Sequence, residues 1–293
     1  MKATTLVLFF VCIPLLIKAQ ELELLDIHYS ISPIQTSTSH EYIQQGSIKL
    51  RYPIIAGQRN QFLVGPTYDI MWVGKTINDH QALHGLSVQV AWQRKIRSNL
   101  SFSWLFTPGI YSDFKDIREE DFRFSTAFRM KHTLSEKTSI GFGIGYARQF
   151  FGNVLMPFLE IDWKINDRWS MSGLFPIRPK IEYLVTKRLT LGTQIQVDNS
   201  SSRLSSQYNE SQIVQFKQWN AQLYADWKLY KNLYFSLIAG YVFRRKVQVF
   251  TKDTKVPWTL FTFPIGGERT AIRTIAANGY LLQAGLAIKL KRR

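Results

Sequence analysis

The chain has one cysteine, few acidic residues and, after its amino-terminal segment, no long apolar run. Cys12 lies inside that first segment, so a processed chain could form neither a disulfide nor a thiolate metal site. Without further apolar runs, the rest of the chain has no segment suited to a spanning helix. The 37 lysines and arginines outnumber the 21 acidic residues but form no dense patch, which argues against nucleic acid as a partner.

The amino terminus has the pattern of a secretory signal peptide. Lys2 precedes an apolar stretch from Thr5 to Ile17, and Ala19 is the small residue expected before a cleavage site. The stretch is too short to cross a bilayer as a stable helix. We therefore predict that residues 1–19 are removed, which takes away two lysines, lowers the net charge from +16 to +14 and leaves residues 20–293 as one domain.

The segment from Trp219 to Phe243 shows a pattern that recurs through most of the chain. Apolar residues occupy the odd positions and polar residues most of the even ones, on both sides of a short break at 230–232. Because successive side chains of a strand point to opposite faces, this pattern predicts a hairpin with one apolar and one polar face. Each arm has about ten residues or more, enough for a tilted strand to cross a bilayer.

Fourteen such segments can be laid out, and their connections alternate between short and longer ones. This alternation is typical of outer-membrane barrels. A soluble β-sandwich would also alternate, but it has fewer strands. We predict an all-β, transmembrane, antiparallel up-and-down β-barrel of fourteen strands, with twelve as the alternative. The short connections are 56–60, 95–99, 134–138, 166–168, 187–188 and 230–232, and the longer ones include 74–84, 111–121, 199–212 and 246–278.

Three local features lead to more specific expectations. Pro66 lies within a strand and cannot donate to the ladder, so we expect a bulge or irregularity there. Gly141, Gly143 and Gly145 share one face of a strand, which predicts a bulky neighbour or a sharp bend. The 246–278 loop is too apolar for a solvated flap, so we expect it either to fold inward as a constriction or to extend two strands.

Charged side chains on the polar faces are expected to lie inside the barrel, because lipid cannot solvate them. They allow two interpretations: a solute path that favours anions, or a lumen in which opposite charges pair and plug the tube. Both interpretations remain open from the sequence. The predicted lumenal set is Asp26, Lys49, Arg51, Asp69, Arg123, Arg129, Lys131, Glu160, Asp162, Lys180, Glu182, Asp226, Lys228 and Arg244.

His28 and Ser30 raise a third hypothesis, a lipid hydrolase with a base and a nucleophile on one strand face. Asp26 shares that face, however, and an enzyme acting on membrane lipid needs its site on the outer wall. The remaining histidines have no metal-ligand spacing. We therefore predict no catalytic residue, no metal and no cofactor.

The last strand resembles the terminal signal read by the barrel-assembly machinery. Its pattern consists of Gln283, Gly285 and two apolar residues, Ile288 and Leu290, where aromatic residues are more usual. The Lys-Asn-Leu and Asp-Arg-Trp turns and the stretch from Phe175 to Tyr183 are similar to outer-membrane barrels of unknown function from Bacteroidota. The resemblance implies outer-membrane location, lipid contact and the assembly machinery as a partner, but no activity.

From these patterns we expect a pore or transporter for a small solute. The alternatives are a plugged barrel with a structural or surface-interaction role and, third, the lipid hydrolase.

Overall fold

The computed structural model describes residues 22–35, 40–74, 82–205, 212–267 and 269–290. The predicted signal peptide lies outside these residues. Within them, no helix is both long and apolar enough to cross a membrane. The elements are β1 (Leu22–Gln35), β2 (His40–Leu50), β3 (Tyr52–Ala56), β4 (Asn60–Trp72), β5 (Ala82–Arg97), β6 (Leu100–Ser112), the short 3-10 helix η1 (Glu119–Asp121), β7 (Phe122–Thr133), β8 (Thr138–Gln149), β9 (Gly152–Lys164), β10 (Trp169–Phe175), β11 (Arg178–Thr186), β12 (Leu189–Arg203), β13 (Gln212–Tyr230), β14 (Leu233–Thr251), β15 (Val256–Leu260), β16 (Phe263–Ile265), β17 (Arg273–Ile275) and β18 (Gly279–Leu290).

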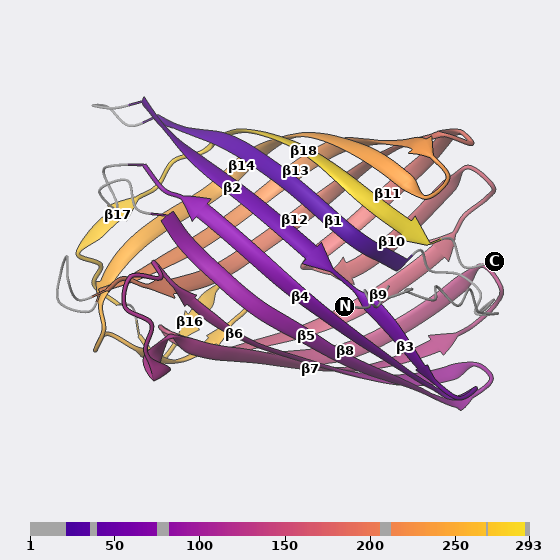
Figure 1. The fold of residues 1–293 in the computed structure, drawn as a ribbon, viewed down its shortest axis with the longest axis horizontal. Coiled ribbons are helices and arrows are strands. Elements are labelled where there is room, and N and C mark those ends of the chain that lie inside the picture. The colour runs from indigo at the N-terminus through magenta and orange to yellow at the C-terminus, as the bar shows by residue number, and fades with distance from the viewer. Residues whose placement is uncertain (1–21, 36–39, 75–81, 206–211, 268, 291–293) are drawn as a thin grey trace, which may run out of the picture.

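The strands form a closed antiparallel barrel (Figure 1). β18 pairs with both β1 and β14, which closes the wall, and β2 and β3 together act as one wall strand. The wall therefore has fourteen strands, as predicted, and the alternative of twelve is wrong. Because the number is even, both ends of the described chain lie at one rim, where Leu22 pairs with Leu290.

The outer face of the wall is apolar and carries two rows of aromatic rings. The first row runs from Phe62 to Trp92, Phe102 and Phe128, with ring centroids 6.0 to 6.5 Å apart. The second row runs across β6, β7 and β8 and ends on Trp258 of β15, 6.3 Å from the ring of Tyr146. Strand alternation produces these rows, because cross-strand neighbours on one face lie within contact distance.

The expectations for proline and glycine are confirmed. Opposite Pro66 the wall strand is interrupted at Arg51, between β2 and β3, since proline has no N–H to donate there. A side chain at Gly143 would overlap both the ring of Phe158 and the carbonyl oxygen of Phe128. Glycine is therefore required at this position by the close approach of its neighbours.

β10 and β11 are short, and the loop after β14 covers the space above them. β15 pairs in parallel with the start of β9, from Gly152 to Leu155, and forms a hairpin with β16. The Phe261 N–H donates to the Leu155 carbonyl at 3.0 Å, and Asn199 Nδ2 donates to the Phe261 carbonyl at 3.0 Å. The 246–278 segment thus contributes a β15–β16 hairpin to the wall, while its first residues extend β14 and pair with β17.

One extra residue, Phe243, changes the alternation of β14. Trp219 pairs with Arg244 and Asn220 with Val242, so Phe243 is left out of the ladder as a β-bulge. Beyond the bulge, the side chain of Arg245 lies on the same face as that of Val242. The odd positions of β14 therefore face outward before the bulge and inward after it.

Candidate functional site

A four-residue ion network lies on the inward faces of β7 and β9. The Glu160 carboxylate accepts bonds from Arg129 Nη1 at 2.7 and 3.0 Å and from Lys131 Nζ at 3.0 Å. Lys131 also pairs with Asp162, and Arg129 Nη2 donates to the Ser103 hydroxyl at 2.9 Å. Glu160 is 4% exposed, and the two cations balance the two carboxylates. These charges favour a self-neutralising patch over an uncompensated ring of cations.

Two further predicted lumenal carboxylates, Asp226 and Glu182, also have partners. Asp226 accepts from Lys289 Nζ at 2.6 Å and from the Ser236 hydroxyl at 2.5 Å. Glu182 accepts from Lys180 Nζ at 3.0 Å and from the Tyr224 hydroxyl at 2.9 Å. Lys289 is absent from the predicted lumenal set, although the alternation of the last strand places it on the inner face.

Near β1 and β2 the predicted charges also have partners. Asp26 lies 2.8 Å from His28 Nδ1 and is in register with Lys49. Arg51 Nη1 lies 3.4 Å from a carboxylate oxygen of Glu23. Farther along the wall, the Ser47 hydroxyl donates to Asp69 at 2.6 Å, and Lys228 is in register with Tyr234.

Two predicted lumenal arginines have other surroundings. Arg123 lies with its guanidinium 3.6 Å from the centre of the Phe150 ring, and its Nη1 donates to the Phe122 carbonyl at 2.5 Å. Arg244 is the register partner of Trp219, so the two side chains point to the same face of the sheet. Arg244 therefore cannot face the lumen if Trp219 faces outward, as its place among the apolar odd positions predicts. The placement of Arg244 in the lumen is wrong because the bulge at Phe243 shifts the alternation by one residue.

Arg245 takes the inward position that was assigned to its neighbour. It is 2% exposed, and its guanidinium donates to Gln218 Oε1 at 3.0 Å and to the Ser32 hydroxyl at 2.5 Å. It also donates to the Pro33 carbonyl at 3.3 Å. These bonds tie β14 to β13 and to β1.

An apolar cluster fills the end of the barrel away from the chain termini. Its members on β1 and β2 share the inward face with buried Ser32 and Ser47, and its members on β13 and β14 lie beyond the bulge. Every member is at most 8% exposed. The extension of β13 and β14 therefore packs against the inner face of β1, β2 and β5 and closes this part of the mouth. The cluster consists of Ile34, Ile43, Val73, Leu83, Leu204, Val214, Phe216, Val247, Val249, Ile275 and Ala277.

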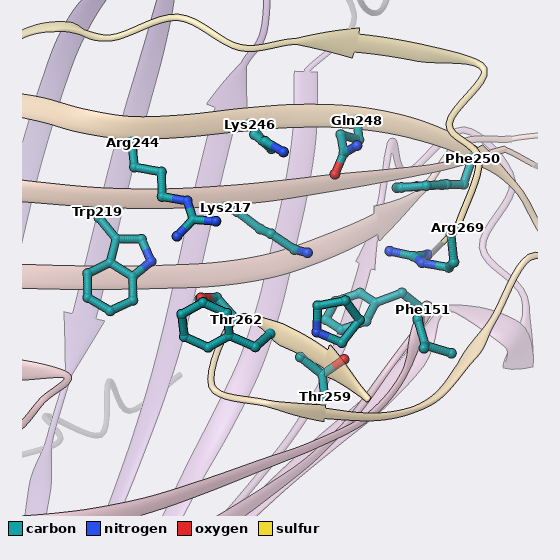
Figure 2. A pocket seen from close by; sticks show the side chains of 13 residues that line it. Phe151, Lys217, Trp219, Arg244, Lys246, Gln248, Phe250, Thr259, Thr262 and Arg269 are labelled. Carbon is teal, nitrogen blue, oxygen red and sulfur yellow. The ribbon is translucent and has the colours of Figure 1, made fainter. Parts of the chain in front are cut away.

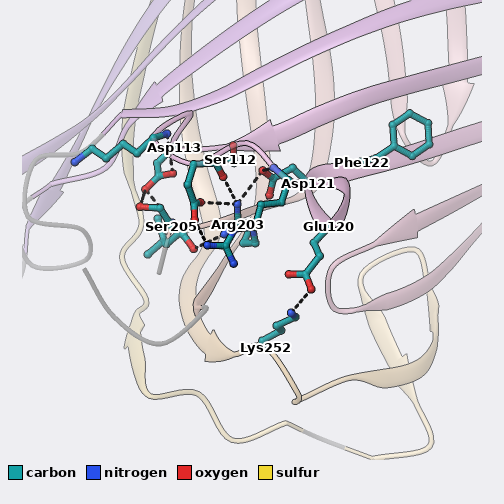
Figure 3. Close-up of polar contacts among 12 residues, drawn as sticks. Ser112, Asp113, Glu120, Asp121, Phe122, Arg203, Ser205 and Lys252 are labelled. Carbon is teal, nitrogen blue, oxygen red and sulfur yellow. Dashed lines mark hydrogen bonds and ion pairs between the residues drawn. The ribbon is translucent and has the colours of Figure 1, made fainter. Parts of the chain in front are cut away.

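A buried ion cluster joins β12 to the segment before β7 (Figure 3). Arg203 is 2% exposed and Asp121 is fully buried, and Arg203 donates through Nε and Nη2 to both oxygens of Asp121. Nη2 also donates to Asp116 Oδ1 at 2.8 Å. We call Arg203, Asp116 and Asp121 the Arg203 cluster. It fixes β12 to the opposite side of the mouth, where Arg203 is also in register with Ser112 of β6.

Two flanking contacts extend this connection. Asp113 Oδ2 accepts from the backbone N–H of Ser205 at 3.0 Å and from its hydroxyl at 2.8 Å. Lys252 pairs with Glu120, and this hydrogen bond from Lys252 holds the pKa of Glu120 below its usual value (Figure 3). The mouth is therefore held by polar contacts on one side of β12–β14 and by the apolar cluster on the other.

A cavity of about 220 Å³ lies between the β13–β14 hairpin and the β15–β16 hairpin (Figure 2). Four of its lining residues are cationic: Lys217, Arg244, Lys246 and Arg269. None of the lining residues, all of which belong to the described chain, is acidic. We call this space the basic cavity. No local sequence pattern indicates the basic cavity, because it depends on the bulge and on the position of the β15–β16 hairpin.

His28 and Ser30 both lie on the inward face of β1. Ser30 is 4% exposed, whereas Ile27 and Tyr29 on the opposite face are 39% and 46% exposed. The hydrolase hypothesis needs these groups at the outer wall, and the structure places them on the other side of it.

Comparison with known proteins places the chain within a sequence family. The family model described as "Domain of unknown function (DUF6268)" matches residues 75–262. No curated protein matches the chain. Among solved structures it is similar to the NanC porin, with 8% identity, TM-score 0.43 and coverage of 91% of this chain and 100% of that one. It is also similar to the KdgM porin in complex with disordered oligogalacturonate (9% identity, TM-score 0.39, 91% and 99% coverage). A third is the P. putida toluene transporter TodX (8% identity, TM-score 0.40, 92% and 88% coverage).

Proposed function

Since this chain belongs to the DUF6268 family, a domain of unknown function, we propose a function from the barrel itself. We propose that the protein is an outer-membrane channel that gives a small solute a path through its lumen. In the structure described above, the extended β12–β14 strands close the mouth, and solute passes when they are displaced.

The outer wall supports the membrane location. Its apolar residues and two aromatic rows match the lipid-facing band and girdles of outer-membrane barrels. The predicted signal peptide and terminal assembly pattern are consistent with export and insertion. Outer-membrane lipid and the assembly machinery are accordingly the proposed partners.

The polar inner face is the observation on which the channel proposal depends. Gln194 Nε2 donates to Gln222 Oε1 at 2.5 Å, and Gln218, Asn220 and Gln222 all lie on one inward face of β13. A barrel that only had to fill its interior could use apolar side chains there. Amides and paired charges keep the lumen compatible with water and with a polar solute.

A plugged barrel with a structural or surface-interaction role is the second candidate. The apolar cluster favours it, because eleven buried apolar side chains at the mouth resist hydration. The channel and the plugged barrel differ in whether the two sides of the apolar cluster ever move apart and open the mouth.

Conductance across a planar bilayer distinguishes them. We expect the chain comprising residues 20–293 to show brief open events, and Phe216→Ser, which weakens the cluster, to raise the open probability. Phe250→Ser is the matched control, because Phe250 is equally buried but lies on the opposite face of the same hairpin. A folded barrel that stays silent as wild type and as Phe216→Ser would refute the channel and leave the plugged barrel.

A further inference from the structure

The basic cavity concentrates positive charge in a partly enclosed space. Lys217 comes from β13, Arg244 and Lys246 from β14, and Arg269 from the segment after β16, and their side chains converge (Figure 2). Like charges brought together in this way repel one another, and the repulsion grows as water is excluded. An arrangement of this kind is stabilised when an anion occupies the space.

Arg269 is held at the cavity by neutral groups. Its guanidinium lies 3.8 Å from the centre of the Phe250 ring and 5.2 Å from that of Phe151. It donates to the Gln215 side-chain oxygen and, at 3.3 Å, to the Thr254 carbonyl. Burial lowers the pKa of Arg269 to about 10, so the group stays charged at neutral pH while its environment supplies rings and neutral oxygens. The planar guanidinium is thereby fixed in orientation before a ligand arrives.

Two hydrogen-bond donors in the lining add directional recognition. Thr262 is 7% exposed, and its buried hydroxyl has no hydrogen-bond partner among the described residues. The buried indole N–H of Trp219 likewise has none within the part of the chain that the structure describes. A buried donor without an acceptor costs free energy, so both groups are suited to donate to a ligand oxygen.

We propose that the basic cavity is a binding site for a small anion that carries phosphate or carboxylate oxygens. The four cations neutralise its charge, and the Thr262 hydroxyl and Trp219 indole donate to its oxygens. The volume of the cavity suits a small anion rather than a polymer. This site does not depend on whether the barrel conducts.

The same oxygens could come from a dissolved anion or from a lipid headgroup, and calorimetry on the detergent-solubilised chain (residues 20–293) tests both. One arm titrates inorganic phosphate and citrate, a second titrates dihexanoyl phosphatidic acid below its micellar concentration, and glycerol is the neutral control. We expect saturable binding in at least one anionic arm, and the arm that binds identifies the source.

Charge-neutral variants assign the binding to the cavity. Lys246→Gln and Arg244→Gln should each weaken binding by about tenfold or more, because each removes one charge-assisted contact. Lys187→Gln is the matched control, since it removes the same charge from an exposed turn at the other end of the barrel. Heat-modifiable migration on a gel verifies that each variant is folded. Absence of anion binding, or binding that is unchanged in both cavity variants, would overturn the proposal.

Discussion

Replacing Arg203 with methionine should loosen the mouth of the barrel. The substitution keeps most of the aliphatic volume but leaves fully buried Asp121 without its charged partner. Removing one member of a buried ion pair typically costs about 3–5 kcal/mol. Asp121 keeps one bond, from the Arg118 N–H at 3.0 Å, so we expect the lower end of that range, about 3 kcal/mol. A loss of that size raises the equilibrium constant for opening of the mouth by a factor on the order of one hundred.

Hydrogen exchange at residues 113–121 measures this effect locally, and urea unfolding in lipid vesicles measures it globally. Arg203→Met should accelerate exchange in this segment and lower the urea midpoint. Adding Asp121→Asn should recover more than half of the loss, because the double variant leaves no uncompensated carboxylate at that position. Lys252→Met removes a more exposed pair and should cost less than about 1 kcal/mol. A stabilising role of the Arg203–Asp121 pair is refuted if Arg203→Met behaves as wild type or if the double variant is no more stable than the single one.

Three further predictions concern the wall, the lumen and the loops. Gly143→Ala should lower the urea midpoint by the equivalent of about 1–3 kcal/mol. Gly145→Ala should be tolerated, because a Cβ added there would lie 3.6 Å from the nearest atom, the carbonyl oxygen of Met156. Glu160→Gln should cost about 2 kcal/mol in the same assay, since it removes the charge that two cations share. Because the pKa of Glu120 is lowered by Lys252, the pairing of these two residues stabilises the fold above about pH 4.5. This stabilisation is lost as the pH falls through the lowered pKa. In Lys252→Met, an NMR titration should show the pKa of Glu120 rising toward 4.5.

The wall of the barrel could be predicted because period-two alternation and turn residues are local properties. The turn at 187–188 lies where the sequence places it, and the turn predicted at 230–232 comprises residues 231–232. Strand lengths were underestimated. The polar stretch 199–203 reads as a loop, yet it continues β12 because it pairs with residues 213–217 of β13.

The mouth and the basic cavity could not be predicted, for two physical reasons. A bulge adds one residue without changing the local composition, so the alternation through Phe243 and Arg244 gives no sign that the faces exchange. The pairing of β15 with β9 joins residues about one hundred positions apart, and it depends on the space left by two short strands. Such contacts follow from the assembled barrel rather than from any local pattern.

That pairing of β15 with β9 also has a consequence for the order of folding. Gly152 meets Val256 only after the intervening strands have been made, so this contact carries a large loop-closure entropy and should form late. Until then the start of β9 has an unpaired backbone edge, and such edges recruit other chains. Partly folded molecules should therefore aggregate through this edge, and a short peptide copying residues 256–260 would be expected to compete for it.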